Sequence, residues 1–106
     1  MPQTTNDDDQ DLIKAKELQN KLSTADPTER QNLLTETIRE QASAVLDQPT
    51  FTLDTNFIEN GLTSLRALEL THKLTTLTGI EIPLVAVIEH PTPQDLGHYM
   101  ATTPTD

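Results

Sequence analysis

Apolar residues recur at three- and four-residue intervals along most of this chain, which is the spacing of one face of an amphipathic helix. The pattern runs through residues 28–46, 64–78 and 84–89, and it starts again at residue 93. A shorter pattern over residues 12–22 precedes these four segments. The spacing therefore predicts four principal helices and a possible extra helix near the N-terminus.

Residues that favour helix ends mark where these helices begin and stop. Asp26 is placed to cap the first principal helix, with Pro27 at its first position and Glu29 at its third. Thr92 precedes a proline in the same way and is expected to cap the last helix. Gly79 follows the second principal helix and is expected to end it in a left-handed conformation.

A long connection, from Pro49 to Thr63, joins the first two principal helices. A connection of this length is unusual unless it is functional or packed by its own side chains. Its apolar residues are therefore expected to be anchors that pack against the helices. They are Leu53, Phe57, Ile58 and Leu62.

Composition favours the same fold class. The chain has 106 residues, enough for one small domain with a tail, and its only aromatic residues are Phe51, Phe57 and Tyr99. A core built mainly from leucine, isoleucine, valine and alanine favours a helical bundle over a sandwich or a barrel. We therefore predict an all-α fold, a small four-helix bundle with a long first loop and a possible extra N-terminal helix.

Polarity along the chain predicts how it is organised. Residues 1–11 are polar and rich in aspartate, so we expect a disordered acidic tail there. Residues 12–27 are expected to form a linker or an extra helix, and residues 28–103 the folded domain. Residues 104–106 are expected to be a frayed tail.

Charge and missing residue types exclude several functions. A formal net charge of −10, without a basic patch that carries aromatics, argues against nucleic-acid binding and favours partners with basic surfaces. The chain has no cysteine, which excludes disulfides and thiolate chemistry. No apolar run approaches about 18 residues, so no membrane span is expected, and the N-terminus lacks a secretory signal pattern.

Enzymatic and metal-binding motifs are also missing from the sequence. His72, His90 and His98 are scattered without the spacing of metal ligands. There is no strand-to-helix serine elbow, no Walker loop and no dinucleotide-binding fingerprint. The sequence therefore predicts neither a metal site nor a catalytic site.

The residues from Asn60 to Leu70 combine a glycine turn with a serine at the start of an apolar helix. Gly61 permits a sharp turn, and Ser64 follows at a cap or first-turn position. The first N–H groups of a helix are unpaired and lie at the positive end of its dipole, so a phosphate on the serine oxygen would be favoured there. The simpler interpretation, which the local pattern alone favours, is that Ser64 is only a helix cap.

The helix that starts at Ser64 has two apolar stripes. The stripe expected to face the core consists of Ala67, Leu70, Leu74 and Leu77. A second stripe carries Ser64, Leu68 and His72, with Leu65 beside it. Exposed leucines next to a functional group suggest a docking surface, although single exposed leucines are also ordinary.

Four motifs, taken in order, resemble an acyl carrier protein. They are GLTSL at residues 61–65, ALEL at residues 67–70, TGIEIP at residues 78–83 and EHPTPQDL at residues 89–96. The resemblance is greatest to carrier domains of modular (type I) polyketide synthases, and it covers about residues 28–103. Each motif alone is weakly specific, whereas the ordered series with this spacing is strong.

The resemblance implies that Ser64 receives 4′-phosphopantetheine from coenzyme A, and that the thiol of this arm holds acyl intermediates as thioesters. It implies a carrier that is not itself an enzyme, located in the cytoplasm and monomeric when isolated. The implied partners are a phosphopantetheinyl transferase, a ketosynthase, an acyltransferase and other polyketide synthase enzymes.

Position and resemblance together assign roles to residues around Ser64. Leu65, Leu68 and His72 are expected to form the docking face for partners. The remaining residues expected to contact the arm or a partner are Leu62, Thr63, Val85 and Ile88.

One residue departs from the family pattern. Thr63 stands where the family usually has an acidic residue that helps the transferase engage, so which transferase recognises this chain is open. A stand-alone fatty acid carrier and a peptidyl carrier remain alternatives with the same chemistry. An unmodified helical interaction module, in which Ser64 is only a cap, is an alternative of a different class. The sequence names neither the acyl cargo nor the neighbouring modules.

Overall fold

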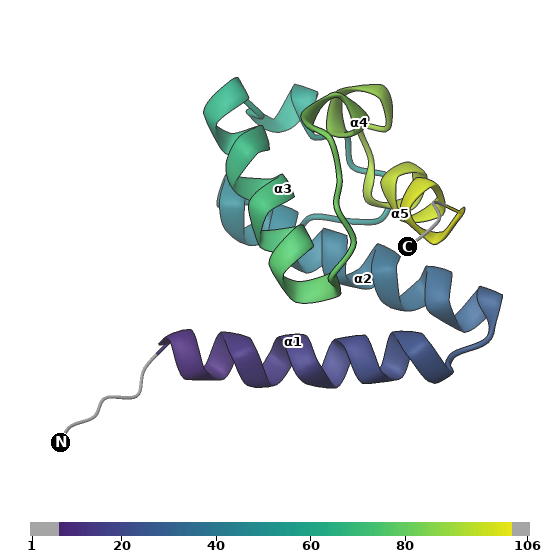
Figure 1. Ribbon diagram of the computed structural model, residues 1–106. Helices are drawn as coiled ribbons and strands as arrows, with labels where there is room; N and C mark the ends of the chain where they lie inside the picture. Colours follow the sequence, from purple (N-terminus) through teal and green to yellow (C-terminus); the bar gives the residue numbers. More distant parts are fainter. Residues whose placement is uncertain (1–6, 103–106) are drawn as a thin grey trace, which may run out of the picture.

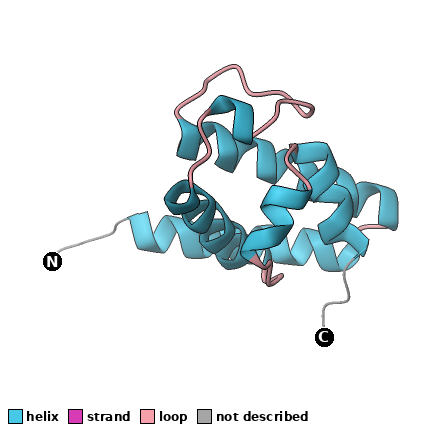
Figure 2. Cartoon of the chain, turned by 90° about the horizontal axis from the view of Figure 1, so that it is seen from above, coloured by secondary structure: helices cyan, strands magenta, loops and turns pink. Residues whose placement is uncertain are grey.

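The local signals in the sequence give five α-helices and a short 3₁₀ helix in the computed structural model, which describes residues 7–102 (Figure 1). The elements are α1 (Asp7–Thr24), α2 (Pro27–Leu46), the 3₁₀ helix η1 (Ile58–Asn60), α3 (Ser64–Thr78), α4 (Leu84–Glu89) and α5 (Pro93–Thr102). Loops join the helices, and the described part of the chain contains no strand (Figure 2). The predicted all-α class is confirmed.

The predicted caps are present at the helix ends. The side chain of Asp26 accepts a hydrogen bond of 2.8 Å from the backbone N–H of Glu29, and α2 begins at Pro27. Thr92 caps α5: its hydroxyl oxygen accepts a hydrogen bond from the backbone N–H of Asp95. Gly79 ends α3 with a left-handed φ of 75°. Local capping chemistry therefore fixes these boundaries.

The core lies where α2 packs against both α3 and α5. Its largest completely buried side chains are Phe57, Leu34, Ile38, Leu70, Leu74, Leu96, Met100 and Val87. The predicted core stripe of α3 is confirmed for three residues, while the fourth, Leu77, is only half-buried. The short helix α4 packs on α3 through the buried side chains of Ala86 and Val87.

The long connection between α2 and α3 is anchored by two phenylalanines. Phe57 is completely buried, and its ring stacks on that of Phe51 with the ring centroids 5.8 Å apart. The backbone N–H of Phe57 donates to the carbonyl oxygen of Pro91 at 2.7 Å, which ties the connection to the start of α5. Phe57 is therefore the predicted anchor that the structure confirms, whereas the sequence did not indicate Phe51.

Two of the other predicted anchors are wrong. Leu53 is exposed, because its backbone rather than its side chain holds the loop: the carbonyl oxygen of Leu53 accepts from the N–H of Gln94 at 2.9 Å. Ile58 is also exposed: it is the first residue of η1 and does not belong to the core. The last predicted anchor, Leu62, is half-buried against the core.

The N-terminal helix α1 packs lengthwise beside the bundle, mainly on α3 (Figure 1). Ala15 and Leu22 are buried, and the side-chain amide of Gln19 donates to the carbonyl oxygen of Leu77 at 3.4 Å. Of the two alternatives for residues 12–27, the structure therefore shows a helix.

The prediction of a disordered tail is wrong for residues 7–11, because α1 already begins at Asp7. Acidic residues in a first helical turn are favoured by the helix dipole, which explains a helix where composition suggested disorder. The rest of that predicted tail, residues 1–6, and the predicted frayed tail at 104–106 lie outside the described residues.

Candidate functional site

The turn before α3 places Ser64 as the first helical residue, not as the cap. Gly61 adopts a φ of 102°, a conformation that favours glycine, and ends η1. The backbone N–H of Leu62 then donates a hydrogen bond of 3.1 Å to the carbonyl oxygen of Phe57. Thr63 is the cap: its hydroxyl oxygen accepts from the backbone N–H of Arg66 at 3.2 Å. The interpretation of Ser64 as only a cap is therefore wrong.

Ser64 differs from the other two serines of the chain in what its hydroxyl does. The Ser23 hydroxyl donates to the carbonyl oxygen of Asn20 at 2.9 Å, and the Ser43 hydroxyl donates to that of Gln48 at 2.7 Å. The exposed Ser64 hydroxyl has no hydrogen bond to any described residue. A solvent-facing oxygen with no internal partner is available for modification.

The start of α3 also provides a favourable position for negative charge. Within the described part of the chain, the N–H groups of Ser64 and Leu65 have no hydrogen-bond acceptor. The first turn of α3 contains no acidic residue. Unpaired N–H groups and the helix dipole together favour an anion at this end of a helix of 15 residues.

Arg66 places a cation in this first turn, but its side chain turns toward another helix. Its guanidinium donates to the carbonyl oxygen of Val45, in the last turn of α2. That last turn has no basic residue of its own, and a cation is favoured at a helix C-terminus. Arg66 therefore ties the start of α3 to the end of α2.

A small cleft lies directly beside Ser64, with a volume of about 210 Å³. Its apolar lining comes from three elements, η1, α3 and α4, and from the turn before α3. The lining residues are Ile58, Leu62, Thr63, Ser64, Ala67, Leu84 and Ile88. Of the residues predicted to contact the arm, Leu62 and Ile88 are thus brought together at Ser64, and Thr63, predicted as a partner contact, lies beside them.

Val85 does not join them. Leu84 and Ile88 stand four residues apart and share one face of α4, whereas Val85 is exposed on the next face. The cleft is also lined by Leu84, Ile58 and Ala67, which the sequence did not indicate as site residues. The four-residue spacing of Leu84 and Ile88 was a signal for the first of them.

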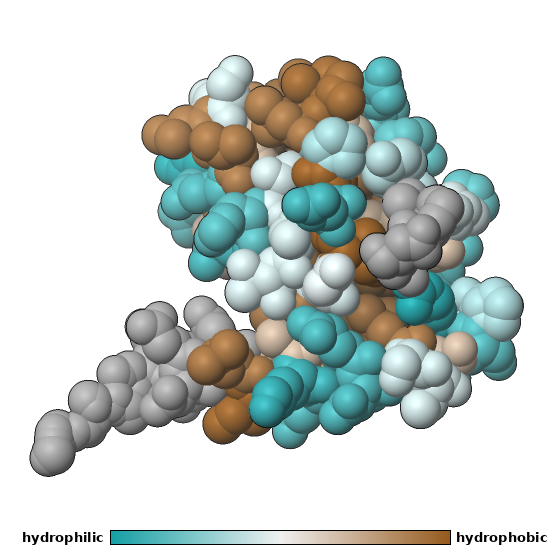
Figure 3. Space-filling view, in the orientation of Figure 1, coloured by the Kyte–Doolittle hydropathy of each residue, from teal (hydrophilic) through white to brown (hydrophobic). Residues whose placement is uncertain are grey.

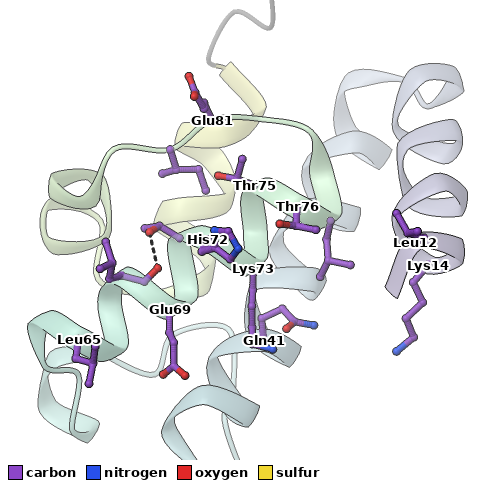
Figure 4. A pocket seen from close by; sticks show the side chains of 14 residues that line it. Leu12, Lys14, Gln41, Leu65, Glu69, His72, Lys73, Thr75, Thr76 and Glu81 are labelled. Carbon is purple, nitrogen blue, oxygen red and sulfur yellow. Dashed lines mark hydrogen bonds between the residues drawn. The ribbon is translucent and has the colours of Figure 1, made fainter. Parts of the chain in front are cut away.

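A larger open groove of about 1120 Å³ runs along the outer face of α3 (Figure 4). The three residues of the predicted docking face, Leu65, Leu68 and His72, all line it. Leu65 and Leu68 are 71% and 56% exposed, so they are apolar surface rather than core. Figure 3 shows hydrophobic surface at the end that carries α4 and the start of α3, and again on α1.

The described residues contain no group of three histidine, cysteine, aspartate or glutamate side chains placed to hold a metal ion. None of the helices in this range combines the length and the hydropathy that a membrane crossing requires.

Comparison with known proteins gives one family and several relatives. Residues 36–100 match the family described as "Phosphopantetheine attachment site". The chain is 39% identical over 88 residues to the spectinabilin polyketide synthase system protein NorA' of Streptomyces orinoci, covering 80% of this chain and 2% of that protein. It is 34% identical over 89 residues to polyketide synthase GfsB of Streptomyces halstedii, covering 81% and 2%.

A third relative is the pikromycin polyketide synthase component PikAII of Streptomyces venezuelae. The identity is 35% over 75 residues, covering 68% of this chain and 2% of that protein. The chain therefore spans about 2% of the length of each of these curated relatives.

Proposed function

This chain belongs to the phosphopantetheine-attachment family, and we propose that it is an acyl carrier that bears its 4′-phosphopantetheine on Ser64 and serves polyketide biosynthesis. The observation that carries the assignment is the Ser64 hydroxyl. It is exposed at the start of α3 and uncommitted, because Thr63 takes the role of the cap. Ser23 and Ser43 are both engaged in hydrogen bonds to the backbone.

The residues around Ser64 suit the group. The unpaired N–H groups at the start of α3 favour the phosphate that would be attached to the Ser64 oxygen. The cleft formed by Leu62, Leu84 and Ile88 supplies apolar surface next to that oxygen. When bound, the group supplies a thiol that holds acyl chains as thioesters, which a chain without cysteine cannot supply itself.

The exposed faces beside Ser64 support a carrier that presents its cargo to enzymes and is not itself an enzyme. Leu65, Leu68 and His72 form the face for partners, which we take to be a phosphopantetheinyl transferase and polyketide synthase enzymes such as a ketosynthase and an acyltransferase. Thr63 adds an uncharged contact for the transferase at the position where the family usually has an acidic residue. The cytoplasm is the compartment that follows from this role.

The polyketide pathway rests on the relatives, whose printed names are those of polyketide synthases. We take the carrier domain to comprise residues 28–103, and the family match to residues 36–100 within this range supports that choice. Fatty acid and peptidyl carriers use the same serine chemistry, so they would share the test below but differ in the enzymes that accept the loaded chain.

The test is the intact mass of the chain after incubation with coenzyme A and a broad-specificity phosphopantetheinyl transferase. We expect a gain of one phosphopantetheine, lost in Ser64→Ala and retained in the matched variant Ser23→Ala. Circular dichroism checks that each variant is folded. No gain with several transferases, or equal loading of Ser64→Ala, would overturn the proposal. An unmodified helical interaction module would then be the better explanation.

A further inference from the structure

The side chain of Thr63 has one hydrogen-bonding role in the folded chain and capacity for a second. Its hydroxyl oxygen accepts from the backbone N–H of Arg66 at 3.2 Å, which caps α3. A hydroxyl group also carries a proton that it can donate. Among the described residues this proton of Thr63 has no acceptor. Because Thr63 is exposed and lines the cleft beside Ser64, the donor is available where the arm would be attached.

The other threonine cap of the fold provides a comparison. The Thr92 hydroxyl caps α5 by accepting from the N–H of Asp95 at 3.1 Å, and it too donates to no described residue. Thr92 does not line the cleft, and a proline rather than a serine follows it. The two caps therefore have the same chemistry, but only Thr63 stands next to an attachment oxygen.

Two backbone donors lie at the same helix end as the Thr63 hydroxyl. Within the described part of the chain, the N–H groups of Ser64 and Leu65 have no acceptor. The Cα–Cβ bonds of a helix tilt toward its N-terminus, so the Ser64 side chain is directed to the end where these N–H groups are unpaired. A phosphate on the Ser64 oxygen would thus have three neutral donors within its neighbourhood.

The first turn of α3 does not direct a cation at this position. Arg66 carries the positive charge of that turn, and its guanidinium donates to the carbonyl oxygen of Val45 on α2. The negative charge of a phosphate on Ser64 would therefore be met by the helix dipole and by hydrogen bonds rather than by an ion pair. This gives each neutral donor, including the Thr63 hydroxyl, a larger share in holding the phosphate.

We propose that Thr63 is a positioning residue for the arm: its hydroxyl donates to the phosphate on Ser64 while its oxygen continues to cap α3. This inference rests on the proposed function, because it concerns the group that Ser64 would carry. The acidic residue that the family usually has at this position also caps helices, but an ionised carboxylate has no proton to donate and repels a phosphate. Thr63 gives this chain a contact with its own arm that a carboxylate cannot make.

The experiment compares the unloaded and the loaded form of the full chain for the parent, Thr63→Ser, Thr63→Val and Thr63→Asp. Intact mass verifies loading, and urea unfolding gives the change in the folded-to-unfolded ratio that loading causes in each protein. The cap lost in Thr63→Val cancels, because it is missing from both forms. We expect loading to raise the ratio about fivefold in the parent and in Thr63→Ser, but only about twofold in Thr63→Val, from the helix dipole alone.

Thr63→Asp keeps a capping oxygen and replaces the donor by a like charge. Loading should leave its folded-to-unfolded ratio unchanged or lower it. Thr63→Ser and Thr63→Asp both retain the cap, so this comparison stands even if Thr63→Val does not fold. The matched variant Thr92→Val should destabilise the unloaded and the loaded form equally, because no modified serine lies beside that cap.

Phosphorus NMR of the loaded proteins reads the contact directly, since a purely structural role of Thr63 as a cap would not move the phosphorus resonance. We expect Thr63→Ser and Thr92→Val to keep the chemical shift of the parent and Thr63→Val to change it. The amide proton of Leu65 should move downfield when the parent is loaded, as its N–H gains an acceptor.

Two results would overturn the proposal: an equal gain from loading in the parent, Thr63→Val and Thr63→Asp, or a phosphorus resonance that Thr63→Val leaves in place. Both are measured on chains that carry the arm. A parent chain that takes up no phosphopantetheine would instead overturn the carrier function, so the two failures are distinguishable.

Discussion

A tight contact between two helices predicts the effect of adding a single methyl group. Gly97 is buried in α5 against Thr35 of α2. A Cβ at Gly97 would lie 2.2 Å from the Thr35 hydroxyl oxygen and 3.0 Å from both its Cα and its Cβ. A rotamer change of Thr35 could move the oxygen, but the contact with Cα is to the backbone. Gly97→Ala therefore requires α5 to move away from α2.

Two opposing terms decide the sign of the change in stability. Alanine is favoured over glycine in a helix interior by about 1 kcal/mol. Overpacking of a filled interface costs about 1–3 kcal/mol, and the backbone contact with Thr35 places Gly97→Ala at the upper end of that range. We expect a net loss of about 2 kcal/mol in the free energy of unfolding.

The measurement is urea unfolding followed by far-UV circular dichroism, with the free energy taken by linear extrapolation. Thr35→Ala alone provides the reference for a double-mutant cycle. The double variant should recover part of the loss, because it removes the hydroxyl contact and leaves the contact with Cα. If Gly97→Ala is instead more stable than the parent by about 1 kcal/mol, helix propensity outweighs overpacking. The close packing of α5 on α2 would then be refuted.

The same unfolding assay checks three further predictions. Thr63→Ala should lower the free energy of unfolding by about 1 kcal/mol, because a helix cap is lost. Ser64→Ala should change it by less than about 0.5 kcal/mol. The reverse order would show that Ser64 is the cap. Phe57→Ala should cost about 3–5 kcal/mol, because the ring is completely buried, and a loss below about 1 kcal/mol would contradict its role as the loop anchor. Arg66→Gln should cost about 1 kcal/mol and speed amide hydrogen exchange in the last turn of α2, and unchanged exchange there would argue against the bond to the Val45 carbonyl.

The helix boundaries could be predicted from the sequence because capping interactions are local. Asp26 and Thr92 act on backbone N–H groups three residues ahead, and Gly79 acts on the turn just before it. The periodicity of apolar residues is equally local, and it placed α3 and α4 at the observed limits. These features depend on neighbours within about one helical turn, so they can be read without the fold.

Local sequence patterns did not predict which residues of the loop before α3 are buried. Apolar character alone made Leu53, Phe57 and Ile58 equal candidates for anchors, but only Phe57 is buried. The choice depends on Phe51 and on Pro91, which lie six and thirty-four residues from it along the chain. Composition likewise suggested disorder for residues 7–11, where the structure continues a helix that packs against α3.

For the candidate site, the sequence by itself indicated Ser64 and its resemblance to a phosphopantetheine-bearing serine, because the motifs around it are contiguous. Only the tertiary structure decided that the Ser64 hydroxyl is uncommitted and that Leu84, rather than Val85, lines the cleft beside it. The physical reason is that burial and clefts arise between segments far apart in the chain. Their relative placement is set by the packing of whole helices, which no local pattern encodes.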